Sequence, residues 1–289
     1  MSDVEHVVSC RNIHGEGPLW DPSARALFWL DMFGEKIWKF EPATGRTAVF
    51  EPGEMVTCIG RRAGGGWVAT TEKHFAFLYL ERGRLEKIAG LELDKPNARF
   101  NDGAVDRQGR FWAGTMTIED GETSSLYRLD QDLTVRTLET GITISNGMGW
   151  SPDNRVMYFT DSARRRINAY DFDPETGSIT NKRILIQTPE GEGEPDGLTV
   201  DADGFLWSAR WDAWKVCRYT PDGALDREVP VPVQFPSSVM FGGENLDELY
   251  ITSSRAWIAG DGHAGQPDAG DIFRFRPGVC GLEEPLFGG

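Results

Sequence analysis

Six polar residues recur along the chain, each five positions before a turn between two apolar, β-type runs. They are Glu16, Thr57, Asn101, Asn146, Asp196 and Ser237, at spacings of 41, 44, 45, 50 and 41 residues. Glycine follows within one or two positions at four of them, in the segments GEGP, NDG, SNG and PDG. Because repeats of one structural unit bring equivalent positions together, we expect these side chains to form a ring.

Two carboxylates and two amides in one ring have the chemistry of a metal site. Carboxylates that share a site repel each other, and a divalent cation between them removes the repulsion while also using the amide oxygens. Oxygen donors favour a hard ion such as Ca²⁺, Mg²⁺ or Mn²⁺, although catalytic sites can hold softer metals. Glu16, Asn146 and Asp196, each directly followed by Gly, are the clearest ligand candidates. Taken singly, each could instead be a turn residue at a strand start, and the sixfold register favours the metal.

Short alternating runs rich in Trp, Tyr, Phe, Val and Ile surround each of these positions and predict strands. The runs come in pairs after a turn, such as ALFWLD with KIWKFEP and FLWSAR with KVCRYTP. A period of forty-odd residues fits one four-stranded antiparallel sheet, so residues 1–289 are predicted to form a single all-β domain, a six-bladed β-propeller. The N-terminal run VEHVVSC would close the last blade. Two stacked β-sandwiches or a β-helix fit less well, because the repeats are regular and no linker divides them.

The first strand of each blade lines the central channel of a propeller, so the ring is expected at the channel mouth. The longest insertion, residues 253–270, is expected to overhang that mouth. Lys and Arg number 30 against 45 Asp and Glu, a net charge of −15, which argues against nucleic acid or an anionic membrane surface as a partner. The N-terminus has neither the basic flank nor the apolar stretch of a signal peptide, which predicts a cytoplasmic protein.

Six segments in this order resemble the SMP-30/gluconolactonase/luciferin-regenerating enzyme family, to which regucalcin and bacterial sugar lactonases belong. They are HGEGPLW, RFNDGAVD, AGTM, ISNGMGWSPD, PDGLTVDADGFLW and FGG, and they span almost the whole chain. The resemblance implies a six-bladed propeller with one divalent ion in its channel. It also implies hydrolysis of a sugar (aldono-) lactone to the aldonic acid, by a monomer or small homo-oligomer whose partner is that small molecule.

Carried over motif by motif, the resemblance implies that Glu16, Asn146 and Asp196 are the metal ligands and that Asp196 is also the general base. The ion could be Ca, Zn, Mn, Mg or Fe(II). Arg99 and Asn101 of RFNDG fall where the family contacts substrate hydroxyls.

The remaining acidic residues of these motifs are assigned less directly. Glu119, after the AGTM segment, also falls where the family contacts substrate, with Asp120 and Glu122 as rivals for that role. Asp102 is expected to brace its turn.

Other residues leave alternatives open. No G-x-S-x-G motif occurs and the four Cys are scattered, so a Ser or Cys nucleophile has little support. His14, two residues before Glu16, could face the channel or be a hydrogen-bonded structural histidine. Trp211 and Trp214 could wall a substrate cup or pack in the core.

Two other functions compete with lactone hydrolysis. One is a non-catalytic calcium-binding or protein-binding propeller, and the other is a metal-dependent esterase or phosphotriesterase. The latter is weakened because such sites generally place a His near the ion.

Overall fold

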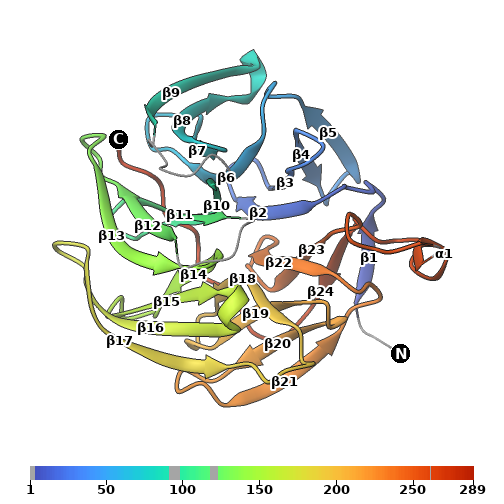
Figure 1. The fold of residues 1–289 in the computed structure, drawn as a ribbon. Coiled ribbons are helices and arrows are strands. Elements are labelled where there is room, and N and C mark those ends of the chain that lie inside the picture. The colour runs from blue at the N-terminus through green and yellow to red at the C-terminus, as the bar shows by residue number, and fades with distance from the viewer. Residues whose placement is uncertain (1–3, 91–97, 118–122, 261) are drawn as a thin grey trace.

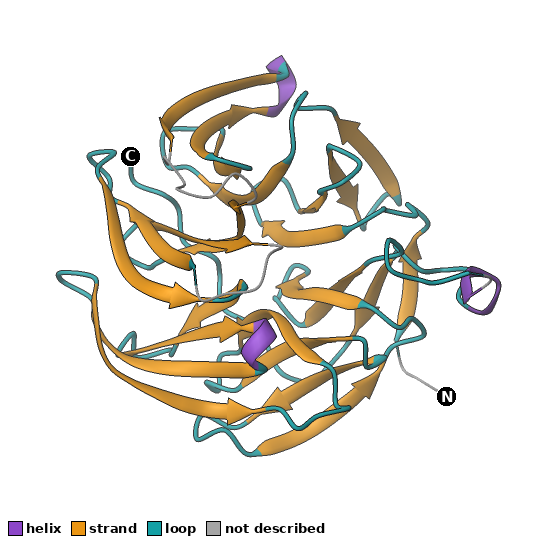
Figure 2. Cartoon of the chain, in the orientation of Figure 1, coloured by secondary structure: helices purple, strands orange, loops and turns teal. Residues whose placement is uncertain are grey.

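Six four-stranded antiparallel sheets are arranged around a central channel, and almost all of the regular structure is β-strand (Figures 1 and 2). The computed structural model describes residues 4–90, 98–117, 123–260 and 262–289. The predicted all-β, six-bladed β-propeller is therefore confirmed.

Five blades follow the order of the chain, and each runs from its innermost to its outermost strand. Blade 1 holds β2 (Gly15–Asp21), β3 (Ala26–Asp31), β4 (Lys36–Glu41) and β5 (Arg46–Phe50). Blade 2 holds β6 (Val56–Arg61), β7 (Trp67–Thr71), β8 (His74–Tyr79) and β9 (Arg84–Gly90). Blade 3 holds β10 (Ala98–Val105), β11 (Phe111–Thr117), β12 (Ser124–Leu129) and β13 (Val135–Ile142). Blade 4 holds β14 (Ser145–Trp150), β15 (Val156–Asp161), β16 (Arg166–Asp173) and β17 (Ser178–Gln187). Blade 5 holds β18 (Glu194–Val200), β19 (Leu206–Trp211), β20 (Lys215–Tyr219) and β21 (Leu225–Pro230).

Blade 6 joins the two ends of the chain. Its inner strands are β22 (Pro236–Gly242), β23 (Glu248–Ser253) and β24 (Ile272–Phe275), and its outer strand is β1 (Glu5–Val8). The predicted closure by the N-terminal strand is thus confirmed. The described helices are the short η1 (Leu80–Arg82), η2 (Ser162–Arg164) and α1 (Gly262–Gly265). In Figure 1, α1 projects from the rim of the ring, so this part of the 253–270 insertion does not overhang the channel.

Apolar side chains fill the spaces between neighbouring blades. Trp29, Trp112 and Trp207 occupy the second strands of blades 1, 3 and 5 and have no exposed surface. In blades 3 and 5 the indole also fixes the preceding turn. Trp112 Nε1 donates to Asp106 Oδ2 at 2.9 Å, and Trp207 Nε1 donates to Asp201 Oδ2 at the same distance. Because the indoles of Trp112 and Trp207 each find an acceptor, the turn, the second strand and the interblade core are fixed together in blades 3 and 5.

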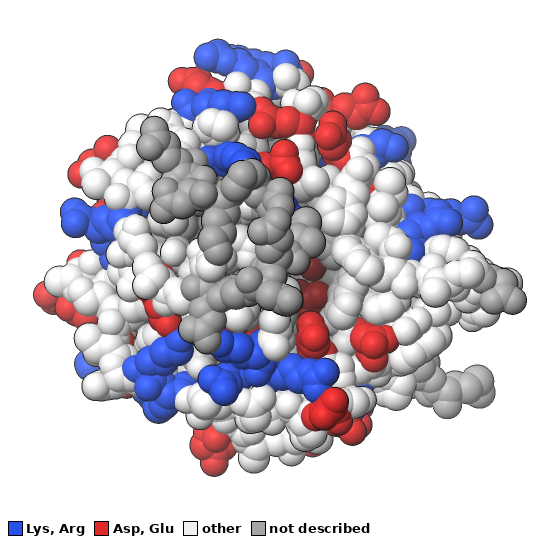
Figure 3. All heavy atoms as spheres, viewed as in Figure 1, with Lys and Arg blue, Asp and Glu red and all other residues white. Residues whose placement is uncertain are grey.

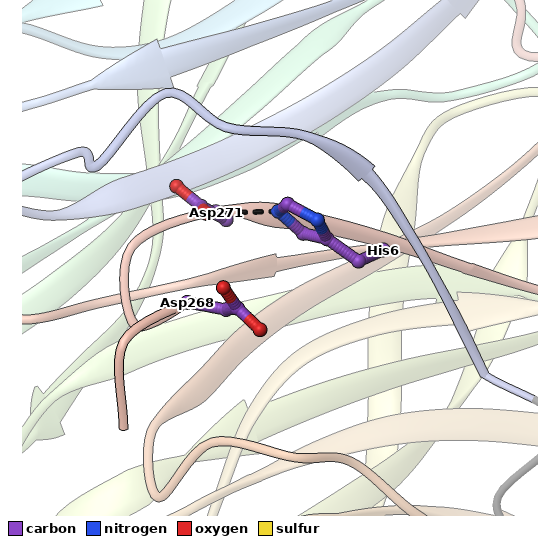
Figure 4. Close-up of side chains that lie close together, drawn as sticks. All are labelled: His6, Asp268 and Asp271. Atoms are coloured by element: carbon purple, nitrogen blue, oxygen red, sulfur yellow. Dashed lines mark hydrogen bonds and ion pairs between the residues drawn. The ribbon is translucent and has the colours of Figure 1, made fainter. Parts of the chain in front are cut away.

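The closure of the ring is fastened by one buried carboxylate, that of Asp271. Its Oδ1 accepts hydrogen bonds from the backbone N–H groups of Cys10 (2.9 Å) and Arg11 (2.6 Å). Its Oδ2 pairs with His6 Nε2 of β1 at 2.8 Å, as Figure 4 shows. These contacts join residues that lie about 260 positions apart in the sequence.

We expect Asp271→Ala to lower the free energy of unfolding by about 2–4 kcal/mol, because two backbone donors and His6 lose their acceptor. Urea denaturation measures this. Asp268→Ala is the matched control, since Asp268 lies beside this contact but is partly exposed, and it should change the free energy by less than about 0.5 kcal/mol. An unchanged urea midpoint for Asp271→Ala would show that the Asp271 carboxylate does not stabilise the closure of the ring.

Candidate active site

The six predicted polar residues lie on the innermost strands, which contact one another around the axis in the order β2, β6, β10, β14, β18, β22 and back to β2. In every blade the register between the first and second strands shifts near the predicted residue. The shifts fall between Glu16 and Leu19, Val56 and Cys58, Phe100 and Gly103, Ser145 and Met148, Pro195 and Leu198, and Pro236 and Ser238. A bulge releases residues from the ladder and re-aims their side chains. Each blade therefore has the same kind of register shift next to its ring residue.

Glycines after two of these residues let neighbouring innermost strands approach closely. A Cβ on Gly147 would lie 2.2 Å from the backbone nitrogen of Leu198, and one on Gly197 would lie 2.7 Å from Cα of Ser238. Any other residue would push blades 4, 5 and 6 apart at the ring. These glycines therefore allow the backbones of neighbouring innermost strands to approach closely.

Three carboxyl groups lie around the axis on alternate blades, those of Glu16 and Asp196 buried and that of Asp102 half-buried. Glu16 lies on blade 1, Asp102 on blade 3 and Asp196 on blade 5. Burial raises the pKa of Glu16 to about 8, with a further contribution from the charge of Asp102. Burial likewise raises the pKa of Asp102 to about 6. It raises the pKa of Asp196 well above its ordinary value, and the charges of Glu16 and Asp102 add to this shift. The site thus makes ionisation of these carboxyls more costly unless positive charge is brought to it.

Asp196 and Asn146 have the features expected of ligands for a cation. Oδ1 of Asp196 is buried and has no hydrogen-bond partner in the described part of the chain. Asn146 donates from Nδ2 to Ser162 Oγ at 3.1 Å, and Ser162 Oγ donates to Pro195 O at 2.7 Å. This relay uses the amide nitrogen of Asn146, and among the described residues no hydrogen bond to its amide oxygen is found. An unpaired carboxylate oxygen, a second carboxylate and an oriented amide oxygen fit a hard divalent ion.

The three carboxyl groups do not all have the spacing of ligands to one ion. With ligand distances of about 2.0–2.4 Å, two ligands of one ion lie at most about 4.8 Å apart. The oxygens of Glu16, Asp102 and Asp196 do not all lie within 4.8 Å of one another. Asp102 Oδ1 accepts a hydrogen bond from the backbone N–H of Gly103 at 2.7 Å. Asp102 thus bonds to its own strand at the register shift of β10, and its charge also acts on the site, which was not expected from the sequence.

One group in the described residues does meet the 4.8 Å spacing, and it lies at the ring closure. It consists of His6, Asp268 and Asp271 (Figure 4). His6 and Asp271 already pair with each other there.

Thr57 and Ser237 are used within the fold. Thr57 Oγ1 lies 2.8 Å from Thr70 Oγ1. Ser237 Oγ donates to Gly15 O at 2.5 Å and lies 2.9 Å from Thr252 Oγ1. The hydroxyl of Ser237 therefore ties blade 6 to blade 1 beside Glu16.

Arg99 and Asn101 form a connected polar pair on β10. Arg99 Nη1 donates to Asn101 Oδ1 at 2.7 Å and to Phe100 O at 2.9 Å. Asn101 Nδ2 donates to Ser145 O of the neighbouring blade at 2.8 Å. Burial lowers the pKa of Arg99 to about 10, while the charges of Glu16 and Glu72 oppose the shift, so the guanidinium keeps its charge at neutral pH.

Not every predicted substrate residue can be placed in the structure. Glu119 and its rivals Asp120 and Glu122 lie outside the described residues.

An aromatic cluster made of His14, Phe33, Trp211 and Trp257 lies next to Glu16. The His14 ring stacks on Phe33 with centroids 5.1 Å apart and meets Trp211 and Trp257 edge-on at 5.6 and 5.0 Å. Burial lowers the pKa of His14 to about 3, so the ring is neutral. Trp211 thus belongs to this cluster beside Glu16, whereas Trp214 is 42% exposed on the turn between β19 and β20. Phe33 and Trp257 were not anticipated, since neither follows the repeat.

The opposite end of the channel is closed by the C-terminal segment. Leu282, Glu283, Glu284 and Pro285 line a cavity of about 80 Å³ together with residues of the innermost strands, Asp102 among them. Burial raises the pKa of Glu284 to about 7, opposed by the charges of Arg107 and Arg61. The channel is therefore blocked by protein at one end.

Charge is unevenly spread over the face seen in Figure 3. Acidic atoms gather beside its centre, and a band of basic atoms crosses it over η2. In the described residues, no helix has the length and apolar character needed to cross a membrane.

Comparisons with known proteins agree with one another over nearly the whole chain. The model of the SMP-30/Gluconolactonase/LRE-like region matches residues 14–255. Regucalcin from Oryctolagus cuniculus is 35% identical over 299 residues, which cover 100% of both chains. Pentonolactonase XacC from Haloferax volcanii is 35% identical over 289 residues, covering 96% of this chain and 94% of its own. The crystal structure of a calcium-binding protein, regucalcin, from Agrobacterium tumefaciens has a TM-score of 0.92 at 28% identity, covering 98% of this chain and 96% of the other.

The raised pKa of Glu16 predicts how the stability of the metal-free protein depends on pH. An acid whose pKa rises on folding stabilises the fold below its unfolded value, here 4.5, and this contribution is lost as pH rises through about 8. In chelator, we expect Tm to fall by about 5–10 °C between about pH 5 and about pH 9. The Tm of Glu16→Gln should fall less steeply with pH, and added divalent ion should reduce the pH dependence of the parent's Tm. Parallel slopes for parent and variant would show that Glu16 does not titrate in this range.

Proposed function

Because the chain belongs to the SMP-30/Gluconolactonase/LRE-like family, we propose that it hydrolyses a sugar lactone to the corresponding aldonic acid. The observation that carries the proposal is the buried, unpartnered Oδ1 of Asp196 beside Glu16, Asp102 and Asn146. The similarity to a pentonolactonase over 96% of this chain supports the class of substrate. A small-molecule lactone is the proposed partner. We propose that the protein is a monomer or small homo-oligomer and that it acts in the cytoplasm.

We propose that one divalent ion is held by Glu16, Asn146 and Asp196. The three lie on the innermost strands of blades 1, 4 and 5, and their oxygens are of the type that hard cations prefer. The similarity to a protein described as calcium-binding supports an ion at this site, and its identity among Ca, Zn, Mn, Mg and Fe(II) is left to experiment. When bound, such an ion would polarise the lactone carbonyl and offset the repulsion among the carboxyls.

Asp196 is proposed as the general base. Its ionised carboxylate accepts a proton from the water whose oxygen attacks the carbonyl carbon. The bond between that carbon and the ring oxygen then breaks, and the proton passes to the ring oxygen, which becomes a hydroxyl. A neutral Asp196 cannot accept the proton, so the raised pKa of Asp196 makes the activity depend on positive charge at the site.

Arg99 and Asn101 are proposed to hold the substrate. Within the described residues only Nη1 of Arg99 is engaged in hydrogen bonds, which leaves its remaining N–H groups for substrate hydroxyls or the carbonyl oxygen. Asn101 is fixed at both ends of its amide, by Arg99 and by Ser145 O. It therefore orients Arg99 and presents one rigid polar edge to the substrate.

The second candidate function is calcium binding without catalysis. The printed description of the Agrobacterium tumefaciens structure favours it, since that protein is called calcium-binding. Ion binding without turnover of any lactone would support this function instead.

The first test is a panel of five- and six-membered aldonolactones, followed by pH-stat titration of the acid formed. We expect chelated protein to be inactive and single divalent ions to restore activity to different extents, because the carboxyls need a counter-charge. Full turnover by protein that elemental analysis shows to be metal-free would contradict the metal dependence. No acid release with any lactone and ion would contradict the proposed reaction.

The second test is Asp196→Asn, which keeps size and one oxygen donor but removes the charge and the proton acceptor. At saturating ion, kcat should fall by about 10²- to 10⁴-fold, as for loss of a general base. The exposed Asp203, on the turn after the same strand, gives the matched control Asp203→Asn, which should retain the parent's kcat. Turnover of the Asp196 variant within a few-fold of the parent would limit Asp196 to holding the ion.

A further inference from the structure

The aromatic cluster of His14, Phe33, Trp211 and Trp257 is not used by the reaction described above. Its members come from three adjacent blades: His14 and Phe33 from the ends of β2 and β3 in blade 1, Trp211 from β19 in blade 5, and Trp257 from the segment after β23 in blade 6. The Trp257 ring lies 5.0 Å from Trp211 and 5.5 Å from Phe33, centroid to centroid. Residues far apart in sequence thus make one continuous aromatic surface.

This surface stands beside the proposed ion ligands. His14 precedes Glu16 by two residues, and along a strand such residues share a side. Trp211 pairs in register with Glu194, two residues before Asp196. The cluster therefore borders the channel at the end where the ring residues lie.

The cluster also stands across the ring from the polar pair. In a ring of six blades, blade 6 is opposite blade 3. Arg99 and Asn101 belong to blade 3, whereas Trp257 belongs to blade 6 and its neighbours in the cluster to blades 5 and 1. The proposed ion ligands come from blades 1, 4 and 5, so an ion that they hold would lie near the axis, between blade 3 and blade 6. A substrate at the ion would have a polar edge on one side and an aromatic wall on the other.

Two features of the cluster are not explained by packing. Trp257 is 49% exposed, so half of a large apolar ring faces solvent although other aromatics of the cluster are within contact distance. His14 is only 7% exposed, and its Nδ1 has no hydrogen-bond partner in the described part of the chain. An exposed indole and an unpaired buried nitrogen each cost stability in the free protein, as is common where a ligand completes the site.

We propose that the aromatic cluster, with Trp257 as its exposed member, binds the C–H face of a cyclic sugar lactone while Arg99 and Asn101 bind its hydroxyl edge. This inference rests on the proposed function. The carbon-bound hydrogens of a sugar ring carry slight positive charge and suit the negative face of an indole, and the contact removes apolar surface from water. An open-chain aldonic acid has no such flat face. The aromatic cluster therefore binds the cyclic lactone more tightly than the open-chain acid that is its product.

The test uses Trp257→Ala, Trp257→Phe and the control Trp214→Ala, whose exposed indole lies on the β19–β20 turn at the same end of the blades. With D-glucono-1,5-lactone as substrate, Trp257→Ala should raise KM about tenfold and change kcat less than about threefold. Trp257→Phe should recover most of the loss, and Trp214→Ala should match the parent. Because Trp257 is half exposed, the fold should tolerate all three changes, and circular dichroism checks this.

A binding measurement separates this inference from the proposed reaction. D-glucono-1,5-lactam, in which an amide replaces the ester, is titrated into the ion-loaded protein and followed by tryptophan fluorescence. We expect quenching in the parent and about tenfold weaker binding in Trp257→Ala. If Trp257→Ala turns over lactone with unchanged KM and unchanged lactam affinity, the aromatic cluster does not bind the sugar ring, and the proposed hydrolysis is unaffected. If lactam binding depends on Trp257 but no lactone is turned over, the aromatic cluster binds the ring, and the proposed hydrolysis is wrong. Neither binding nor turnover would overturn both.

Discussion

The gathering of three carboxyl groups around one axis is the constraint on which the rest of the structure depends. Glu16 and Asp196 are buried and Asp102 is half-buried. The charge of Asp102 raises the pKa of Glu16, and the charges of Glu16 and Asp102 raise the pKa of Asp196. They come from alternate blades, and the blades between them contribute the neutral Thr57, Asn146 and Ser237 to the ring. This alternation keeps like charges apart, yet only a closed ring holds them close enough for one small ion to influence all three.

The polar groups around the ring also hold the innermost strands against one another. Asn101 bonds to Ser145 O across blades 3 and 4, and Ser162 bonds to Pro195 O across blades 4 and 5. Ser237 makes the corresponding bond from blade 6 to Gly15 O of blade 1. The geometry of the candidate site and the cohesion of the channel wall are therefore set by the same hydrogen bonds. Rigid placement of this kind is what allows a metal-type donor set to remain in position without the ion.

The repeat explains why so much could be predicted from the sequence. The ring positions and the closure by β1 follow from a period of forty-odd residues, because each blade must present the same strand to the axis. Asp102 was understood only in part, since its neighbour Asn101 holds the repeat position and the charge of Asp102 acts through burial, which spacing does not reveal. Phe33 and Trp257 lie in connections outside the repeat, so no periodic signal marks them. Their meeting with His14 depends on how three blades are placed in space.

The pairing of β1 with β24 has a consequence for the order of events during synthesis. β1 is made before the other described strands yet belongs to the last blade, so Glu5–Val8 must wait until Ile272–Phe275 has been made. At about 5–20 residues per second, that delay is on the order of 15–50 seconds. During this time the earlier blades have no closed channel, and the buried carboxyls remain open to water. The acidic ring is thus assembled last, when the two ends of the chain meet.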